Sequence, residues 1–166
     1  ALDVGGAGSW EYRHDLDHHI LSDGLINLLG CSPTKAPRTR RDWMERVHPA
    51  DRPLLNAAVS ELQAAKSTSQ IVEYRIRHAD GHWLWIEDRS CVTERNADGS
   101  PKITAGVLND ITERHQARQQ ITRQNRALRM MGGVAQALVR HTDEKLMLDE
   151  VCTVVVEIGG YRMAWM

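Results

Sequence analysis

Apolar and polar residues alternate along parts of the chain, a period of two that is typical of β-strands, and five strands are expected. In the first segment Trp10 and Tyr12 alternate with charged residues, and in the third Val72, Tyr74 and Ile76 do the same. Asp-Gly turns separate the last three segments, as expected of hairpins. The predicted strands cover residues 9–13, 19–21, 72–76, 83–92 and 103–108.

Between the second and third strands the apolar residues follow helical spacing instead. Ser22 predicts the N-cap of one short helix, and Thr39 with Asp42 three residues later predicts the start of another. A longer helix is expected over residues 48–65, with a proline in its first turn. The predicted order of elements is therefore β-β-α-α-α-β-β-β.

An arginine-rich helix is expected directly after the last strand. Residues 110–113 predict a capping box in which Asp110 is the N-cap. Gly132-Gly133 predicts an interruption of this helix, and Thr142 predicts the cap of a further helix. The residues after Gly159-Gly160 have the pattern of a strand, for which the sequence contains no partner.

Composition narrows the class of protein. The 166 residues include 21 Lys or Arg and 22 Asp or Glu, a net charge of −1, which favours neither a nucleic-acid binder nor a membrane-surface protein. No run approaches the roughly 18 apolar residues of a membrane span, and no signal peptide is visible. Cys31, Cys91 and Cys152 are too few and too scattered for a disulfide framework, so a cytoplasmic location is expected.

Four stretches have the residue order of one known family. They are residues 22–30, residues 43–52 with the motif HPADR, residues 74–87 with HADGHWLWIE, and residues 106–114 with NDITER. Over residues 8–114 the sequence resembles a PAS domain. The resemblance implies an α+β PAS fold, in which helices cover one face of a five-stranded antiparallel sheet.

The C-terminal part resembles the opening of a second sensory family. Residues 128–166 are similar to the start of a GAF domain, chiefly through Val151-Cys152 and residues 159–165. The expected organisation is a PAS domain over 8–112, a signalling helix over 111–131 and a GAF fragment over 132–166. Since the chain lacks an initiator Met and ends inside an apolar run, we expect it to be a piece of a longer protein. Such strings resemble the input halves of bacterial histidine kinases and cyclic-dinucleotide enzymes, so a downstream output domain is expected.

The resemblance implies a small ligand pocket between the sheet and its helices. Strand alternation and helix position select the side chains that point into it: Trp43, Leu55, Val59, Val72, Tyr74, Ile76, Leu84, Ile86, Asp88, Ser90 and Leu108. The alternative is that these side chains simply fill the core.

No cofactor is identified by the sequence. Residues 34–48 contain no cysteine, which argues against a photochemical flavin adduct. Haem held by His48 and a flavin stacked on Trp43 stay open as less favoured alternatives. His14, His18 and His19 have metal-ligand chemistry, but their predicted place in a hairpin turn favours a solvated surface.

Catalytic motifs are absent from the sequence. It has no Gly-flanked Ser elbow, phosphate-binding loop or HExxH motif. His115 lacks the neighbouring residues of a kinase phosphoacceptor. The chain is therefore expected not to be an enzyme.

The other face of the sheet is expected to carry an apolar patch that needs a cover. Its members are Trp83, Trp85, Ile103, Ala105 and Val107. An N-terminal segment or a second subunit would cover it, and PAS relatives commonly use both, so a homodimer is expected.

Heptad positions in the arginine-rich helix predict a weak coiled-coil seam, because Arg114 and Arg118 share it with Ile121 and Leu128. A solvated single helix is the alternative. The function that we expect is sensing of a small ligand, relayed through Asp110, Ile111 and Thr112 into a pair of such helices. A ligand-free dimerisation module is the rival interpretation.

Overall fold

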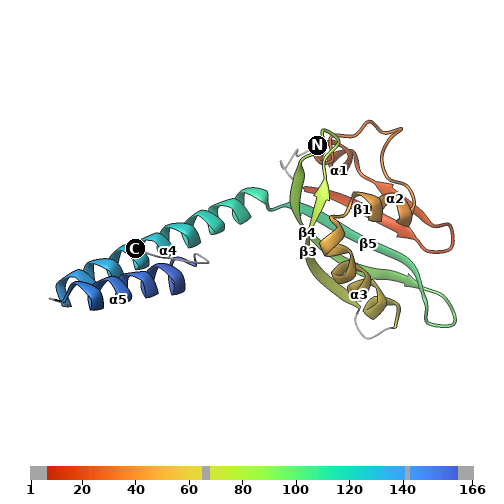
Figure 1. Cartoon of the computed structure of the whole chain (residues 1–166). Helices are drawn as coiled ribbons and strands as arrows, with labels where there is room; N and C mark the ends of the chain where they lie inside the picture. Colours follow the sequence, from red (N-terminus) through yellow and green to blue (C-terminus); the bar gives the residue numbers. More distant parts are fainter. Residues whose placement is uncertain (1–6, 65–67, 141–142, 161–166) are drawn as a thin grey trace. The chain divides into compact units, whose positions relative to one another are not determined.

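The structure is a computed structural model that describes residues 7–64, 68–140 and 143–160 (Figure 1). The chain divides into two compact units, and the boundary in the sequence lies between residues 113 and 114. The first contains all five strands and the short helices, and the second contains most of one long helix and a further helix.

The first unit has the predicted order of elements. They are β1 (Ala7–Arg13), β2 (His18–Leu21), α1 (Asp23–Leu28), α2 (Arg40–Arg46), the 3₁₀ turn η1 (Pro49–Asp51), α3 (Arg52–Gln63), β3 (Ser69–Arg77), β4 (Trp83–Arg95) and β5 (Pro101–Asp110). The strands form one antiparallel sheet in the order β2-β1-β5-β4-β3. Figure 1 shows α1, α2 and α3 over the same face of the sheet. The predicted α+β fold is confirmed.

Local capping signals set two of the helix starts as predicted. The Ser22 side chain accepts a hydrogen bond from the backbone N–H of Leu25, and Thr39 and Asp42 form a capping box at the start of α2. The predicted start of the third helix was wrong by a few residues, because a 3₁₀ turn precedes α3. Asp51 does not cap α3, since its carboxylate binds the backbone N–H and guanidinium of Arg75 at 2.7–3.0 Å.

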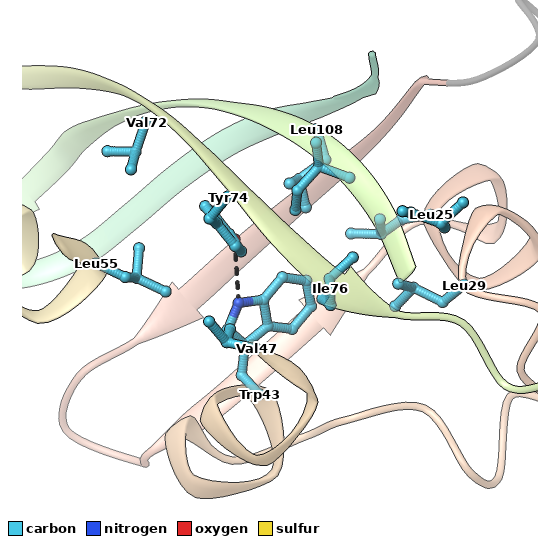
Figure 2. Packing of buried hydrophobic residues seen from close by; sticks show 11 residues of the cluster. Leu25, Leu29, Trp43, Val47, Leu55, Val72, Tyr74, Ile76 and Leu108 are labelled. Carbon is cyan, nitrogen blue, oxygen red and sulfur yellow. Dashed lines mark hydrogen bonds between the residues drawn. The ribbon is translucent and has the colours of Figure 1, made fainter. Parts of the chain in front are cut away.

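The core lies between the sheet and the helices and consists of large apolar side chains (Figure 2). Its fully buried members are Leu25, Leu29, Val47, Tyr74, Ile76, Ile86 and Leu108. Burial of one such side chain stabilises the fold by about 1.5–3 kcal/mol. β1 approaches α1 so closely that a Cβ at Gly8 would overlap the backbone of Leu25. Strand β1 and helix α1 are therefore packed directly against each other.

The second unit corrects a prediction about the arginine-rich helix. Helix α4 (Thr112–Arg140) runs through Gly132-Gly133 without interruption and is followed by α5 (Glu144–Glu157). A Cβ at Gly133 would lie 2.7 Å from Val154 Cγ1, whereas a Cβ at Gly132 would meet nothing within 4 Å. Gly133 therefore serves the close packing of α4 on α5 and does not end the helix.

The ends of α5 are held by polar contacts. The Asp143 side chain caps its start, accepting from the backbone N–H groups of Lys145 and Leu146. The predicted cap, Thr142, and the predicted strand over 161–166 lie outside the described residues. At the other end, Arg126 Nε of α4 donates to the carbonyl oxygen of Ile158 at 2.9 Å. No helix in the described part of the chain has the length and apolar character to cross a membrane.

Candidate ligand cavity

Asp88 on β4 lies at the centre of a buried hydrogen-bond network. Trp10 Nε1 donates to Asp88 Oδ1 at 3.2 Å, and the Tyr74 hydroxyl donates to Asp88 Oδ2 at 3.3 Å. Trp43 Nε1 in turn donates to the Tyr74 oxygen at 3.2 Å (Figure 2). Gly106, opposite Trp10 on β5, leaves room for the indole, because a Cβ there would lie 2.9 Å from Trp10 Cε2.

Burial controls the charge of this network. Removal of the carboxyl group from water raises the pKa of Asp88 to about 7, although the hydrogen bonds from Trp10 and Tyr74 oppose the rise. Burial also raises the pKa of Tyr74 well above its usual value, and the nearby Asp88 charge adds to this effect. The phenol is therefore neutral, while the carboxyl group changes its protonation state near neutral pH.

A cavity of about 60 Å³ adjoins this network. The side chains that line it come from both layers of the fold: Trp10, Tyr12, His14, His19, Arg40, Trp43, Met44, Leu55, Val59, Leu62, Gln63, Gln70, Asp88 and Thr104. The α3 wall is mainly apolar, and the polar groups come mainly from the strands and the β1–β2 turn. Such a mixture of an apolar lining and a few polar groups is typical of ligand sites.

Two polar atoms on the wall are buried and have no hydrogen-bond partner among the residues that the structure describes. They are His19 Nδ1 and Gln70 Oε1. The His19 ring stacks on Trp43 with a centroid distance of 5.5 Å, and burial lowers its pKa to about 4, so the imidazole is neutral at pH 7. His14 Nε2 lies 2.9 Å from Thr104 Oγ1. The polar wall thus offers unused hydrogen-bonding capacity without a charged imidazole at His19.

The structure divides the predicted pocket residues into two groups. Trp43, Leu55, Val59 and Asp88 line the cavity. The remaining seven are buried but do not line it: Val72, Tyr74, Ile76, Leu84, Ile86, Ser90 and Leu108. Tyr74 still acts on the cavity indirectly, because its hydroxyl joins Trp43 to Asp88.

Sequence reasoning missed the part of the wall that β1, β2 and β5 contribute. Trp10, Tyr12 and His14 alternate on β1 and at its end, and all three face the cavity. The expectation of a solvated histidine turn was wrong for His14 and His19, which are half-buried cavity residues. The alternation Thr104, Gly106, Leu108 could have placed Thr104 on the inner face.

The cavity does not fit the cofactor alternatives. Pockets for drug-sized ligands measure about 300–1,000 Å³, several times the 60 Å³ found here. His48 does not line the cavity, because its ring packs edge-on against Trp83 at 4.7 Å. The Trp43 face is stacked by His19. Neither a haem on His48 nor a flavin on Trp43 therefore finds room in this arrangement.

The segment that leads from β5 into α4 is joined to β4 by a pair of hydrogen bonds. Ile111 N–H donates to the Trp85 carbonyl at 2.8 Å, and Trp85 N–H donates to Thr112 Oγ1 at 2.9 Å. The Asp110 carboxylate accepts from Thr112 N–H at 2.8 Å, so Asp110 binds the first residue of α4. The predicted relay residues Asp110, Ile111 and Thr112 are thus in contact with the sheet at this joint.

The predicted outer-face residues keep part of their surface exposed. Trp83 is 39% exposed and Val107 is 41% exposed, whereas Trp85, Ile103 and Ala105 are half-buried. The Arg75 guanidinium lies 5.1 Å from the centre of the Trp85 ring and covers part of it.

Comparison with known proteins gives a consistent result. The family model described as "PAS fold" matches residues 19–108. The chain is 31% identical over 133 residues to the two-component sensor PprA of Pseudomonas aeruginosa, and 27% identical over 136 residues to the methyl sulfide methyltransferase-associated sensor of Methanosarcina acetivorans. These matches cover 78% and 79% of this chain but only 14% of each relative.

Two solved structures share the fold. The sensory box histidine kinase/response regulator of Burkholderia thailandensis matches with a TM-score of 0.65 and 26% identity, over 75% of this chain and 92% of that one. The N-terminal domain of a diguanylate cyclase with PAS/PAC sensor from Marinobacter aquaeolei matches with a TM-score of 0.57 and 27% identity, over 66% and 98%. The chain therefore belongs to the PAS family of sensory domains.

Proposed function

We propose that this PAS domain senses a small neutral molecule in the cavity beside Asp88 and passes its occupancy to helix α4. The single observation that carries the proposal is the pair of buried, unpartnered atoms on the cavity wall, His19 Nδ1 and Gln70 Oε1. A buried polar atom without a partner costs about 1–3 kcal/mol, which a ligand with matching groups would recover.

The wall also restricts the chemistry of the ligand. Gln70 Oε1 accepts hydrogen bonds, so the ligand must donate one, and the neutral His19 ring offers its Nδ1 as the second polar contact. The apolar side chains of Leu55, Val59 and Leu62 require an apolar side on the same molecule. Small amides and five-membered nitrogen heterocycles meet these requirements within about 60 Å³.

Strands β4 and β5 connect the cavity with the start of α4, and this connection supports the relay. Asp88 lies on β4 three residues after Trp85, whose backbone binds Ile111 and Thr112. Thr104 lies on β5, which ends at Asp110. A shift of either strand caused by the ligand would therefore change the hydrogen bonds that hold the first turn of α4.

Titration followed by the indole N–H signals in ¹H–¹⁵N NMR spectra tests ligand binding. Panels of small amides and azoles are added to the full chain and to Val59→Phe, in which the larger side chain fills the cavity. We expect at least one probe to shift the Trp10 and Trp43 indole signals saturably, with little effect on Trp83. The shifts should disappear in Val59→Phe.

Probes that leave the Trp10 and Trp43 signals unmoved, or that shift Trp83 equally, would contradict a ligand site in the cavity. Leu54→Phe is the matched control, because Leu54 lies on the same helix, is 54% exposed and does not line the cavity. This variant should retain the wild-type response.

A ligand-free dimerisation module is the second candidate, and the exposed apolar surface favours it. Trp83 and Val107 are partly exposed on the outer face, and Ile121 and Leu128 on the predicted seam of α4 are 58% and 67% exposed. A second copy of this chain would cover both surfaces. A dimer could also sense a ligand. The ligand-free dimerisation module would therefore be preferred only if no ligand binds in the cavity.

Sedimentation velocity tests the dimer. Val107→Lys should lower the fraction of dimer, since a charge would be placed in the interface. Leu16→Lys, at a 63% exposed position in the β1–β2 turn, should have no effect. Equal sedimentation of the wild type and both variants would contradict an interface at Val107.

The lengths of the relatives support a proposal about the whole protein. Because it spans 14% of the length of the two sensors named above, we propose that an output domain belongs to the same protein. The GAF start over residues 132–166 remains a prediction. The three cysteines are free, and the cytoplasmic location remains a prediction.

A further inference from the structure

Three residues with metal-ligand side chains converge on the turn between β3 and β4. His78, Asp80 and His82 each contribute one ligand atom, and these atoms lie within 4.8 Å of one another. His78 Nδ1 and His82 Nδ1 lie 2.9 Å and 2.5 Å from the same carboxylate oxygen, Asp80 Oδ1, and His78 Nδ1 also accepts from the Asp80 backbone N–H at 3.3 Å. None of the three lines the ligand cavity.

The backbone holds this cluster in place. His78 N–H donates to the His82 carbonyl at 2.9 Å, which closes the turn, and Ala79 N–H donates to the Leu29 carbonyl at 2.9 Å, which ties the turn to the end of α1. The His78 ring lies against Gly30 so closely that a Cβ there would overlap Nε2. The position of His78 is therefore fixed before any ligand binds, which lowers the entropic cost of binding.

The two imidazole rings stack with a centroid distance of 4.5 Å and an interplanar angle of 27°. Two imidazole nitrogens and one carboxylate oxygen suit borderline transition metals, whereas Mg²⁺ and Ca²⁺ prefer oxygen ligands alone. The exposed side of the turn leaves further coordination positions to water, since the His82 and Asp80 side chains are 54% and 61% exposed.

We propose that His78 Nδ1, His82 Nδ1 and an Asp80 carboxylate oxygen bind one divalent transition-metal ion, with Zn²⁺ as the probe. Zn–N and Zn–O bonds of about 2.0–2.2 Å set tetrahedral ligand atoms roughly 3.3–3.6 Å apart. The ligand atoms lie within 4.8 Å already, so rotation of the exposed His82 and Asp80 side chains brings all three to that spacing.

Calorimetric titration of the untagged full chain with ZnCl₂ tests the site. We expect one ion per chain for the wild type. His82→Ala and Asp80→Asn should each weaken binding at least about tenfold, because even loss of a residue that only orients a metal ligand costs 10–100-fold. Both side chains are largely exposed, so these variants should fold, and unchanged Trp10 and Trp43 indole signals would verify this.

Asp98→Asn is the matched control, because Asp98 lies on the other Asp-Gly turn of the sheet without a nearby histidine pair and binds Ser100. It should bind zinc like the wild type. The proposal is overturned if the wild type shows no saturable binding, if His82→Ala and Asp80→Asn retain wild-type affinity, or if Asp98→Asn loses as much affinity as they do. None of these outcomes depends on the cavity ligand.

Discussion

Asp88 holds its carboxyl group in the core, where the Trp10 indole and the Tyr74 hydroxyl donate to it. These two hydrogen bonds are too weak to offset burial, so the folded protein keeps the proton up to a pKa of about 7. In the unfolded chain the same group titrates near its ordinary value of 3.8. The difference makes Asp88 a source of pH-dependent stability.

Asp88→Asn tests this pH dependence. Between pH 4 and 7 the folded wild type binds more protons at Asp88 than the unfolded chain, so its stability decreases as the pH rises through this window. The full effect is on the order of 4 kcal/mol, at about 1.4 kcal/mol for each tenfold change in proton affinity. Asparagine is neutral like the protonated acid: its Oδ1 accepts from Trp10, and its NH₂ group donates to the Tyr74 oxygen, which reverses the direction of that hydrogen bond.

Urea unfolding at pH 5 and pH 8 measures the outcome. Asp88→Asn should have a stability similar to that of the wild type at pH 5, and should be the more stable protein at pH 8. A constant difference between the two proteins at both pH values would show that Asp88 does not titrate in this window.

Tyr74→Phe removes the hydroxyl between Trp43 and Asp88. The buried Trp43 N–H and one Asp88 oxygen then lose their partners, so we expect a loss of about 1–3 kcal/mol in the free energy of unfolding. Tyr12→Phe serves as the control, because the Tyr12 hydroxyl binds the exposed Asp17. Tyr12→Phe should lower the free energy of unfolding by less in the same denaturation experiment. Equal losses in the two variants would argue against a special role of the buried network.

At the scale of helices and strands, the predictions were correct for features that depend on residues close together in the sequence. Ser22 and Thr39 act within three residues of themselves, and both caps were predicted correctly. Predictions failed where a distant residue decides the outcome. The 3₁₀ turn before α3 was missed, where Asp51 binds Arg75, and Gly133 packs on Val154 instead of ending α4. The sequence does not reveal such partners, because they depend on how the elements pack.

The two glycines of α4 allow a paired test of this interpretation. Gly132→Ala should stabilise α4 by up to about 1 kcal/mol, since alanine favours the helix and the new methyl group meets nothing. Gly133→Ala should give no such gain, because its methyl group would crowd Val154. Amide hydrogen exchange over residues 134–140 and 146–157 measures both effects. Equal protection in the two variants would contradict close packing at Gly133.

At the scale of the whole molecule, the ligand cavity depends on the order of strands in the sheet. Trp10 and Asp88 are 78 residues apart, and they meet because β1 and β4 pair with opposite edges of β5. Strand alternation predicted that Asp88 points inward, but it could not predict the Trp10 partner or the wall that β1 and β2 contribute. Strands β4 and β5 also contain Trp85 and Asp110, the residues that contact the first turn of α4.

The central claim is that the state of the cavity determines how firmly the first turn of α4 is held. Amide hydrogen exchange at Ile111 and Thr112 tests it most directly, since these N–H groups bind the Trp85 carbonyl and the Asp110 carboxylate. Wild type, the cavity-filling Val59→Phe and the control Leu54→Phe are compared. We expect Val59→Phe to change exchange at both amides by at least about fivefold, which corresponds to about 1 kcal/mol, and Leu54→Phe to match the wild type. Identical exchange in all three proteins would contradict the coupling between cavity and helix.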